Sequence, residues 1–274
     1  KGGLKKLTML DLIPKHRFDF LGKRNIAAVV SLLMIGGSIA VFALRGEHNF
    51  GIDFRGGDLL VIDSKLPISL KEARDKISNP DVVIQYEREG VKEMLTLRSP
   101  QGTSQALLTE LQTAFPDRGV TPVGQDTVGA QIGLEFAKRA FWALGLGMLA
   151  ILIYVTLRFE FSFALGAVVA LLHDVIITLG IFSLIGGELS LVMVGAVLTI
   201  AGYSINDTIV VFDRIREGLK NGERGTIQTL MNTSINETLG RTILTGGTTL
   251  LSVGALYFLG GSVLRDFSFA ILIG

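Results

Sequence analysis

The chain has 274 residues, 49% of them hydrophobic, and a mean hydropathy of +0.50. Its formal net charge of +1 gives no reason to propose a nucleic acid as partner. Because the chain contains no cysteine, disulfide bonds, cysteine-ligated zinc and thiol nucleophiles are excluded.

The apolar residues are gathered in runs close to or above the roughly 18 residues that can cross a bilayer, which predicts a multi-span membrane protein. We expect a membrane α-helical bundle of the six-span type. Its complete transmembrane helices are predicted at residues 26–44, 136–157, 161–185, 189–212 and 240–264. A sixth starts at residues 267–274 and is shorter than the about 20 residues that a helix needs to span. We therefore expect an incomplete sixth span, and the start at Lys1 without Met points to a second cut.

Positive charge marks one side of the predicted bundle. Lys and Arg gather in the loops that share a side with the N-terminus, and such loops are normally cytoplasmic. We therefore predict a cytoplasmic N-terminus and a periplasmic or extracellular location for residues 45–135. Residues 1–25 form a basic tail, which fits either a segment lying on the lipid bilayer or a plain charged flank. Residues 213–239 are predicted as an amphipathic connection on the cytoplasmic side.

The external segment at residues 45–135 has a soluble character. Its periodicity and turn signals predict strands and helices in the order β-α-β-β-α-β, which is the ferredoxin-like α+β arrangement. The predicted elements are residues 58–63, 69–77, 82–87, 93–98, 103–115 and 119–128. Such a domain covers one face of its sheet with two helices and leaves the other face for a partner. Because it has no Gly-rich phosphate loop, we expect a binding or mechanical role.

The entry to this domain, Gly51 to Gly57, reads GIDFRGG. Glycine allows a backbone geometry or a close approach that a side chain forbids. If the segment is extended, Asp53 and Arg55 point to the same side. A tight entry into the first strand is the simpler interpretation of this pattern.

Polar residues inside the predicted spans carry the functional information. Asn206 and Asp207 interrupt the fourth span, and His173 and Asp174 interrupt the third. A carboxylate near the middle of a membrane helix costs about 2.5–3.5 kcal/mol on insertion scales, so it usually faces a bundle interior, a partner or a proton path. A structural packing contact is the alternative explanation. The fourth span closes on a cytoplasmic charge cluster of Asp213, Arg214, Arg216 and Glu217.

A cationic partner for Asp207 lies at the start of the fifth span. Arg241, Thr245 and Thr248 share a helix face by their spacing. Counted inward at about 1.5 Å per residue, Asp207 lies roughly 8 Å deep, at a depth compatible with Arg241. An arginine favours the ionised form of a nearby carboxylate, whereas removal from water favours the protonated form. A carboxylate between these influences can bind and release a proton as its surroundings rearrange.

Four motifs resemble those of the SecF family. SecF proteins are subunits of the bacterial SecDF protein-export complex and belong to the resistance-nodulation-division (RND) superfamily. They are GIDFRGG at 51–57, ALLHDV at 170–175, GYSINDTIVVFDRIRE at 202–217 and GRTILTGGTT at 240–249. The resemblance covers essentially the whole chain, and the motif of the fourth span is highly specific.

The resemblance implies an accessory subunit of the Sec protein translocase that uses the proton-motive force to promote preprotein export across the bacterial cytoplasmic (inner) membrane. By motif, Asp207 resembles the family's intramembrane proton-site aspartate and Arg241 its arginine partner. The implied partners are a SecD-like second six-span subunit, the Sec translocon channel and the preprotein. Protons are the coupling ion, with no other cofactor or metal, so the chain is a transport component and not an enzyme. We also expect a supporting polar network, which consists of Asn206, His173, Asp174, Thr245 and Thr248.

Three alternatives come from other classes. A proton-driven small-molecule or lipid exporter of the same superfamily is one, although such exporters usually have larger external domains. An intramembrane aspartyl protease needs two carboxylates that share a proton, and estimated depths of roughly 20 Å for Asp174 and 8 Å for Asp207 separate them. A purely structural anchor does not need Asp207, Arg241 or Asp174 in hydrocarbon.

Overall fold

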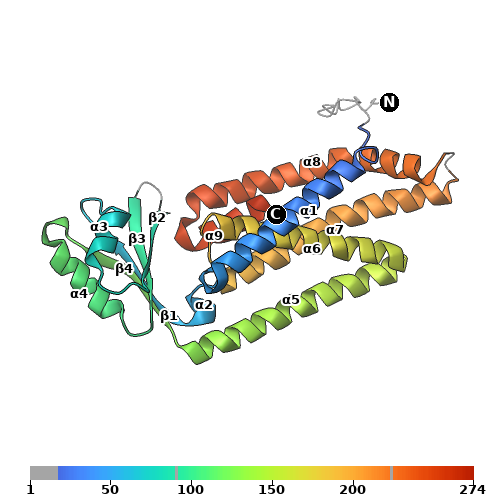
Figure 1. Ribbon diagram of the computed structural model, residues 1–274. Helices are drawn as coiled ribbons and strands as arrows, with labels where there is room; N and C mark the ends of the chain where they lie inside the picture. Colours follow the sequence, from blue (N-terminus) through green and yellow to red (C-terminus); the bar gives the residue numbers. More distant parts are fainter. Residues whose placement is uncertain (1–17, 90–91, 223–224) are drawn as a thin grey trace, which may run out of the picture.

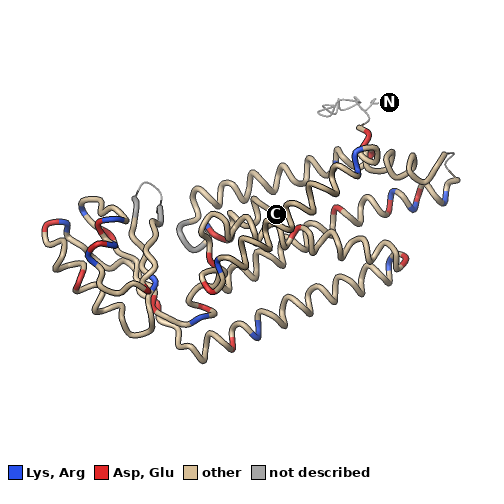
Figure 2. Tube along the Cα trace, in the orientation of Figure 1, with Lys and Arg blue, Asp and Glu red and all other residues tan. Residues whose placement is uncertain are grey.

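The computed structural model describes residues 18–89, 92–222 and 225–274 and has two parts of different character (Figure 1). A small α+β domain lies at one end of a bundle of long helices. Charged residues are spread over the small domain and the ends of the bundle, whereas few lie along its length (Figure 2). Most of the basic tail, residues 1–17, lies outside the described residues.

The bundle consists of α1 (Arg24–Arg45), α5 (Ala130–Arg158), α6 (Phe161–Leu184), α7 (Leu191–Lys220), α8 (Ile227–Leu259) and α9 (Gly261–Ile273). Among the described residues, five of these helices, all except α9, are long and apolar enough to cross a membrane. Their outer surfaces are apolar, with Leu157 and Leu251 exposed to 84% and 77%. Lipid tails solvate such a surface, and helices satisfy their own backbone there. The chain is therefore a membrane protein.

Several helix ends differ from the predicted ones. α7 continues to Lys220 and α8 begins at Ile227, so most of the predicted connection at residues 213–239 is helical. No proline interrupts this stretch, and α8 therefore runs for 33 residues into the predicted fifth span. It ends before Gly260, and α9 begins at Gly261, ahead of the residues predicted to start the sixth span.

The α+β domain follows two short turns, η1 (Gly46–Asn49) and α2 (Ile52–Arg55). It contains β1 (Gly57–Asp63), α3 (Leu70–Lys76), β2 (Val83–Glu89), β3 (Lys92–Ser99), α4 (Ser104–Ala114), η2 (Pro116–Arg118) and β4 (Thr121–Val128). The strands form one sheet in the order β2-β3-β1-β4 with antiparallel neighbours. Apolar residues of α3 and α4 form one core with the sheet. β4 leads into α5, which begins inside the range predicted for the external domain.

Local rules explain the start of this domain. Leu60 of β1 is 1% exposed and lies opposite Leu97 of β3. Alternate residues of a strand face the same side, so β1 presents one apolar face to the core. α3 begins with a capping box, in which the Ser69 hydroxyl accepts from the Glu72 amide and the Glu72 carboxylate accepts from the Ser69 amide. Arg118 pairs with Glu72 at 2.8 Å, and its hydrogen bond holds the pKa of that carboxyl at about 2.

The GIDFRGG segment is not extended, because Ile52–Arg55 form the helical turn α2. Asp53 accepts a hydrogen bond of 2.8 Å from the Leu191 amide at the start of α7. Arg55 instead pairs with Glu47 at 3.9 Å. The prediction that Asp53 and Arg55 point to the same side assumed an extended segment, so it does not apply here. Asp53 instead places a negative charge at the N-terminus of α7, where such a charge is stabilising.

Two glycines allow close approach of the backbone. Gly56 has a φ of +73°, and a Cβ at this position would lie 2.8 Å from the Cα of Ala130. Gly180 of α6 faces Ser38 of α1, and a Cβ there would lie 2.6 Å from the Ser38 Cα. Small residues thus set the distance between α1 and α6, as is common in membrane helix pairs.

Gly180→Ala is expected to destabilise the bundle by about 1–3 kcal/mol, because the added methyl group overpacks the α1–α6 contact. Gly36→Ala, also on a membrane helix, is the matched control, since a Cβ there meets nothing within 4 Å. Thermal unfolding of the purified protein in detergent measures both variants. Equal midpoints for the two variants would contradict this account of the helix contact.

Candidate functional site

Small side chains form part of the contact between α6 and α7. Ala164 and Ala167 of α6 and Ala201 of α7 are at most 2% exposed and belong to one apolar cluster. Such residues let membrane helices approach closely. Polar side chains that project between these helices can therefore reach one another.

His173, Asp174 and Ser204 meet between these two helices. The Ser204 hydroxyl donates to Asp174 Oδ2 at 2.6 Å, and His173 Nδ1 lies 2.8 Å from Asp174 Oδ1. The side chains of His173 and Asp174 are 34% and 30% exposed, so the cluster is half-buried. Sequence reasoning missed Ser204, although its position three residues before Asp207 puts both residues on one face of α7.

This geometry does not match nucleophilic or aspartyl catalysis. In a Ser-His-Asp triad the serine binds the histidine, whereas here Ser204 and His173 each bind the carboxylate. Both oxygens of Asp174 are engaged, and no hydrogen bond joins Asp174 to Asp207 in the described part of the chain. A protease dyad requires two carboxylates that share a proton. In the same part of the chain, no three His, Asp or Glu side chains are grouped to hold a metal ion.

The depth difference estimated for the two aspartates is too large. The Asp174 carboxylate binds Ser204, which precedes Asp207 by three residues, or about 4.5 Å along the helix. The estimate counted inward from the ends of the apolar runs, although α7 continues as a helix beyond Phe212 to Lys220. The lack of a hydrogen bond between the two carboxylates in the described part of the chain, and not their depth, is therefore the argument against a dyad.

Asp207 and Arg241 do not touch in this conformation. Asp207 is half-buried on α7, whereas Asn206 beside it and Arg241 on α8 are exposed. Across the described ranges, neither the Asp207 nor the Arg241 side chain forms a hydrogen bond or an ion pair within 4.0 Å. Thr245 and Thr248 donate to carbonyls of their own helix, Arg241 O at 2.9 Å and Thr245 O at 2.8 Å. In the described ranges, neither hydroxyl accepts a hydrogen bond from the Arg241 guanidinium.

The predicted charge cluster consists of Asp213, Arg214, Arg216 and Glu217. Asp213 pairs with Arg158 at the end of α5 at 3.5 Å, and Arg216 donates to the Arg158 carbonyl at 3.2 Å. Arg214 pairs with Glu217 at 2.7 Å and also with Glu237 of α8. The cluster therefore links α7 to the end of α5 and to α8.

The Arg214–Glu237 pair fixes the register between α7 and α8. Asp207 lies seven residues before Arg214, and Arg241 lies four residues after Glu237, so both are displaced in the same direction along this antiparallel pair. The displacements are about 10.5 Å and 6 Å, which leaves an axial offset of about 4.5 Å. Steps of seven and four residues also return to nearly the same face of each helix. The register thus brings the two residues to adjacent turns.

Residues 109–274 match the family model described as protein export membrane protein SecD/SecF, C-terminal. This range contains α5 to α9 and with them every polar residue of the site. The chain belongs to the SecF family. The protein translocase subunit SecF of Thermodesulfovibrio yellowstonii is 40% identical over 97% of this chain and 91% of its own length. The SecF subunit of Desulfurispirillum indicum is 40% identical over 94% of this chain and 86% of its own.

A solved structure supports the same assignment. The crystal structure of SecDF from Thermus thermophilus, described as a translocon-associated membrane protein, has a TM-score of 0.83 and 38% identity, covering 94% of this chain and 36% of that chain. A SecDF in a super-membrane-facing form has a TM-score of 0.68 and 35% identity, covering 95% and 36%. The resemblance to SecF inferred from the motifs is confirmed, and the chain is a protein translocase subunit by family.

Ser204→Ala is expected to lower stability by about 0.6 kcal/mol, the average for a hydrogen bond between membrane helices. Thr199→Ala is the control, because the Thr199 hydroxyl donates only to the Gly195 carbonyl of its own helix. Thermal unfolding of Ser204→Ala, Asp174→Asn and the double variant forms a double-mutant cycle. Strictly additive effects would show that the Ser204–Asp174 bond contributes nothing.

Proposed function

We propose that the chain is an accessory subunit of the Sec translocase that couples the proton-motive force to preprotein export across the bacterial cytoplasmic membrane. The observation that carries the proposal is Asp207, a half-buried carboxylate inside the apolar helix α7 of a SecF-family protein. Carboxylates at such positions are typical of proton pathways. Protons serve as the coupling ion, and no further cofactor is proposed.

Asp207 and Arg241 form the proposed proton switch. Their register on α7 and α8 supports this pairing, since an arginine side chain can span the offset between adjacent turns. Proton binding by Asp207 releases the arginine, whereas the ionised carboxylate attracts it. Moving one charge through a potential of 100 mV releases about 2.3 kcal/mol, which is enough to shift a two-state helix arrangement.

The proposed partner beside this switch is a SecD-like subunit with six spans. Asn206 and Arg241 are exposed on the bundle, and an exposed arginine on a membrane helix needs a polar partner or water. The Thermus SecDF relative supports this partner, because this chain covers only 36% of its length. The Sec channel and the preprotein are the further proposed partners.

The finer architecture is part of the same proposal. We assign a ferredoxin-like fold to the external domain, which is supported by its order β-α-β-β-α-β and its sheet order β2-β3-β1-β4. We also assign six spans to the complete protein, with α9 as part of the sixth, and a cytoplasmic N-terminus. Nothing in the geometry favours the small-molecule or lipid exporter over this function.

Asp207→Asn should abolish the part of preprotein export that depends on the proton-motive force, because asparagine keeps the shape but cannot ionise. Export into membrane vesicles with and without an uncoupler measures this part. Asp174→Asn should cause a smaller loss, and Asp213→Asn, at a residue with a 61% exposed side chain, is the control. Full proton-dependent export by Asp207→Asn at normal expression would sink the proposal.

Arg241→Lys should also lose proton-dependent export, although the charge is kept. The planar guanidinium of arginine can bind two acceptors in a fixed geometry, and a lysine ammonium is only a point charge. Arg158→Lys is the matched control, because its exposed ion pair with Asp213 contributes little. The same vesicle assay applies, and normal export by Arg241→Lys would reduce the role of Arg241 to charge neutralisation.

A further inference from the structure

The loop between α6 and α7, residues 185–190, is where the membrane helices meet the external domain. Leu189 pairs with the segment before β1, its amide donating to the Asn49 carbonyl at 2.7 Å and its carbonyl accepting from the Gly51 amide at 2.8 Å. A Cβ on Gly51 would lie 3.0 Å from the Leu189 oxygen, so the two backbones are in close contact. The loop is thus held by the chain that leads into the external domain.

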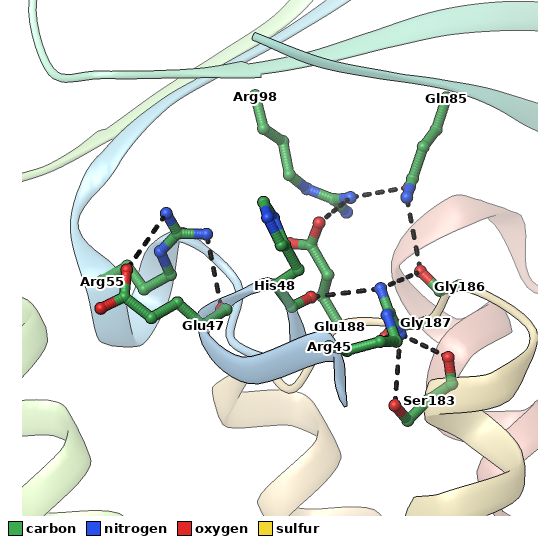
Figure 3. A network of polar contacts seen from close by, with 10 residues as sticks. All are labelled: Arg45, Glu47, His48, Arg55, Gln85, Arg98, Ser183, Gly186, Gly187 and Glu188. Carbon is green, nitrogen blue, oxygen red and sulfur yellow. Dashed lines mark hydrogen bonds and ion pairs between the residues drawn. The ribbon is translucent and has the colours of Figure 1, made fainter. Parts of the chain in front are cut away.

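Arg45 at the end of α1 fixes the loop from below (Figure 3). Its guanidinium donates to the carbonyls of Gly187 at 2.9 Å, Gly186 at 3.3 Å and His48 at 3.2 Å, and also to the Ser183 carbonyl. Several carbonyl groups accept hydrogen bonds from this one cation, so the contact between α1 and the loop is rigid. We call the contact region between the α6–α7 loop and the external domain the joint. Movement of the external domain therefore depends on the contacts above the loop.

Glu188 makes the contact above the loop (Figure 3). Its side chain is only 9% exposed, and it pairs with Arg98 of β3 at 3.1 Å. Arg98 is held by Gln85 of β2, whose oxygen accepts at 2.7 Å, and the Gln85 amide donates to the Gly186 carbonyl at 3.4 Å. The sheet face that α3 and α4 leave uncovered is therefore fastened to the loop around one buried carboxylate.

Charged groups from every neighbouring element surround this carboxylate. Those that line the cavities beside it, or lie near it in Figure 3, are Arg45, Glu47, His48, Asp53, Arg55, Asp81, Arg98, Asp126, Arg265 and Asp266. Glu188 lines three cavities, of about 470, 520 and 390 Å³. Because each is large enough for several waters, protons can reach a carboxylate that is otherwise covered.

We propose that Glu188 is a proton-binding group at the joint between the two parts of the protein. Proton uptake holds the external domain against the α6–α7 loop, and proton loss loosens this contact. Nothing in this proposal requires a function for Asp207, since it concerns the attachment of the external domain and not the intramembrane switch.

The sign follows from how burial acts on the carboxyl group. Removal from water raises the pKa of Glu188, while Arg98, Arg45 and Arg55 oppose this effect without cancelling it. In a loosened joint the carboxyl is solvated and has the ordinary pKa of about 4.3. The closed joint then binds the proton more tightly, so its added stability is present at low pH and is lost as the pH rises through the raised pKa. A simple ion-pair latch would behave in the opposite way and open in acid.

The absence of cysteine from the sequence makes a distance measurement direct. Ala106→Cys on α4 and Leu259→Cys at the end of α8 introduce two exposed sites for nitroxide spin labels. Electron paramagnetic resonance then gives the distance distribution between the labels in the full-length protein in lipid nanodiscs, from pH 8.5 to pH 5. We expect a broad distribution at high pH that narrows as the pH falls.

Two variants test the assignment to Glu188. Glu188→Gln, which mimics the protonated form, should give the narrow distribution at every pH. Arg98→Gln removes an opposing cation and should shift the midpoint of the response upward by about one pH unit or more. Glu160→Gln, at an exposed residue between α5 and α6, is the matched control and should respond as the parent does.

Opposite outcomes overturn the proposal. A distribution that broadens in acid would establish a plain ion-pair latch, and a pH response that persists in Glu188→Gln would assign it to another group. If Arg98→Gln fails to fold, the parent and Glu188→Gln still decide between these results. Asp207→Asn should keep the full response, so failure of the proposed export function and failure of this joint are separate findings.

Discussion

The close contact between α6 and α7 is the constraint on which the arrangement of the polar groups depends. Ala164, Ala167 and Ala201 are almost fully buried there, in a cluster that also contains Leu171 and Ile205. The hydroxyl of Ser204 can therefore bind the carboxylate of Asp174 in a region where both would otherwise lie among apolar residues. In hydrocarbon, an unsatisfied polar group is costly. The close packing of small residues is thus what allows the polar residues of this bundle to form their hydrogen bonds.

Features that depend on local sequence were predictable. Runs of apolar residues gave the five membrane helices, and alternation gave the order of the strands, because both patterns follow from the geometry of a single element. The element predicted at residues 69–77 contains α3 for the same reason. The start of α8 at Ile227 lies inside residues 213–239, which the sequence predicts only as an amphipathic connection. Contacts with α7, such as Arg214 with Glu237, are a tertiary feature that a local pattern does not contain.

In the candidate site, too, the residue types could be predicted from the sequence, whereas the contacts between them could not. The residue types at Asp207 and Arg241 are unusual in apolar runs and could be recognised without a structure, whereas their distance could not. The contact of Asp53 also escaped prediction, because its partner is the amide of Leu191, far away in the sequence. Ser204 is an ordinary residue in a membrane helix, and only the approach of α6 gives it a role.

The two ends of α7 are held with different strength. At the end beside α5, Asp213 and Arg158 have side chains 61% and 49% exposed, and such an ion pair contributes little. At the end beside the α+β domain, Asp53 accepts a hydrogen bond from the first amide of α7, and the side chain of Glu188 in the preceding loop is 9% exposed. The end of α7 beside the α+β domain is thus held by more buried contacts than the end beside α5.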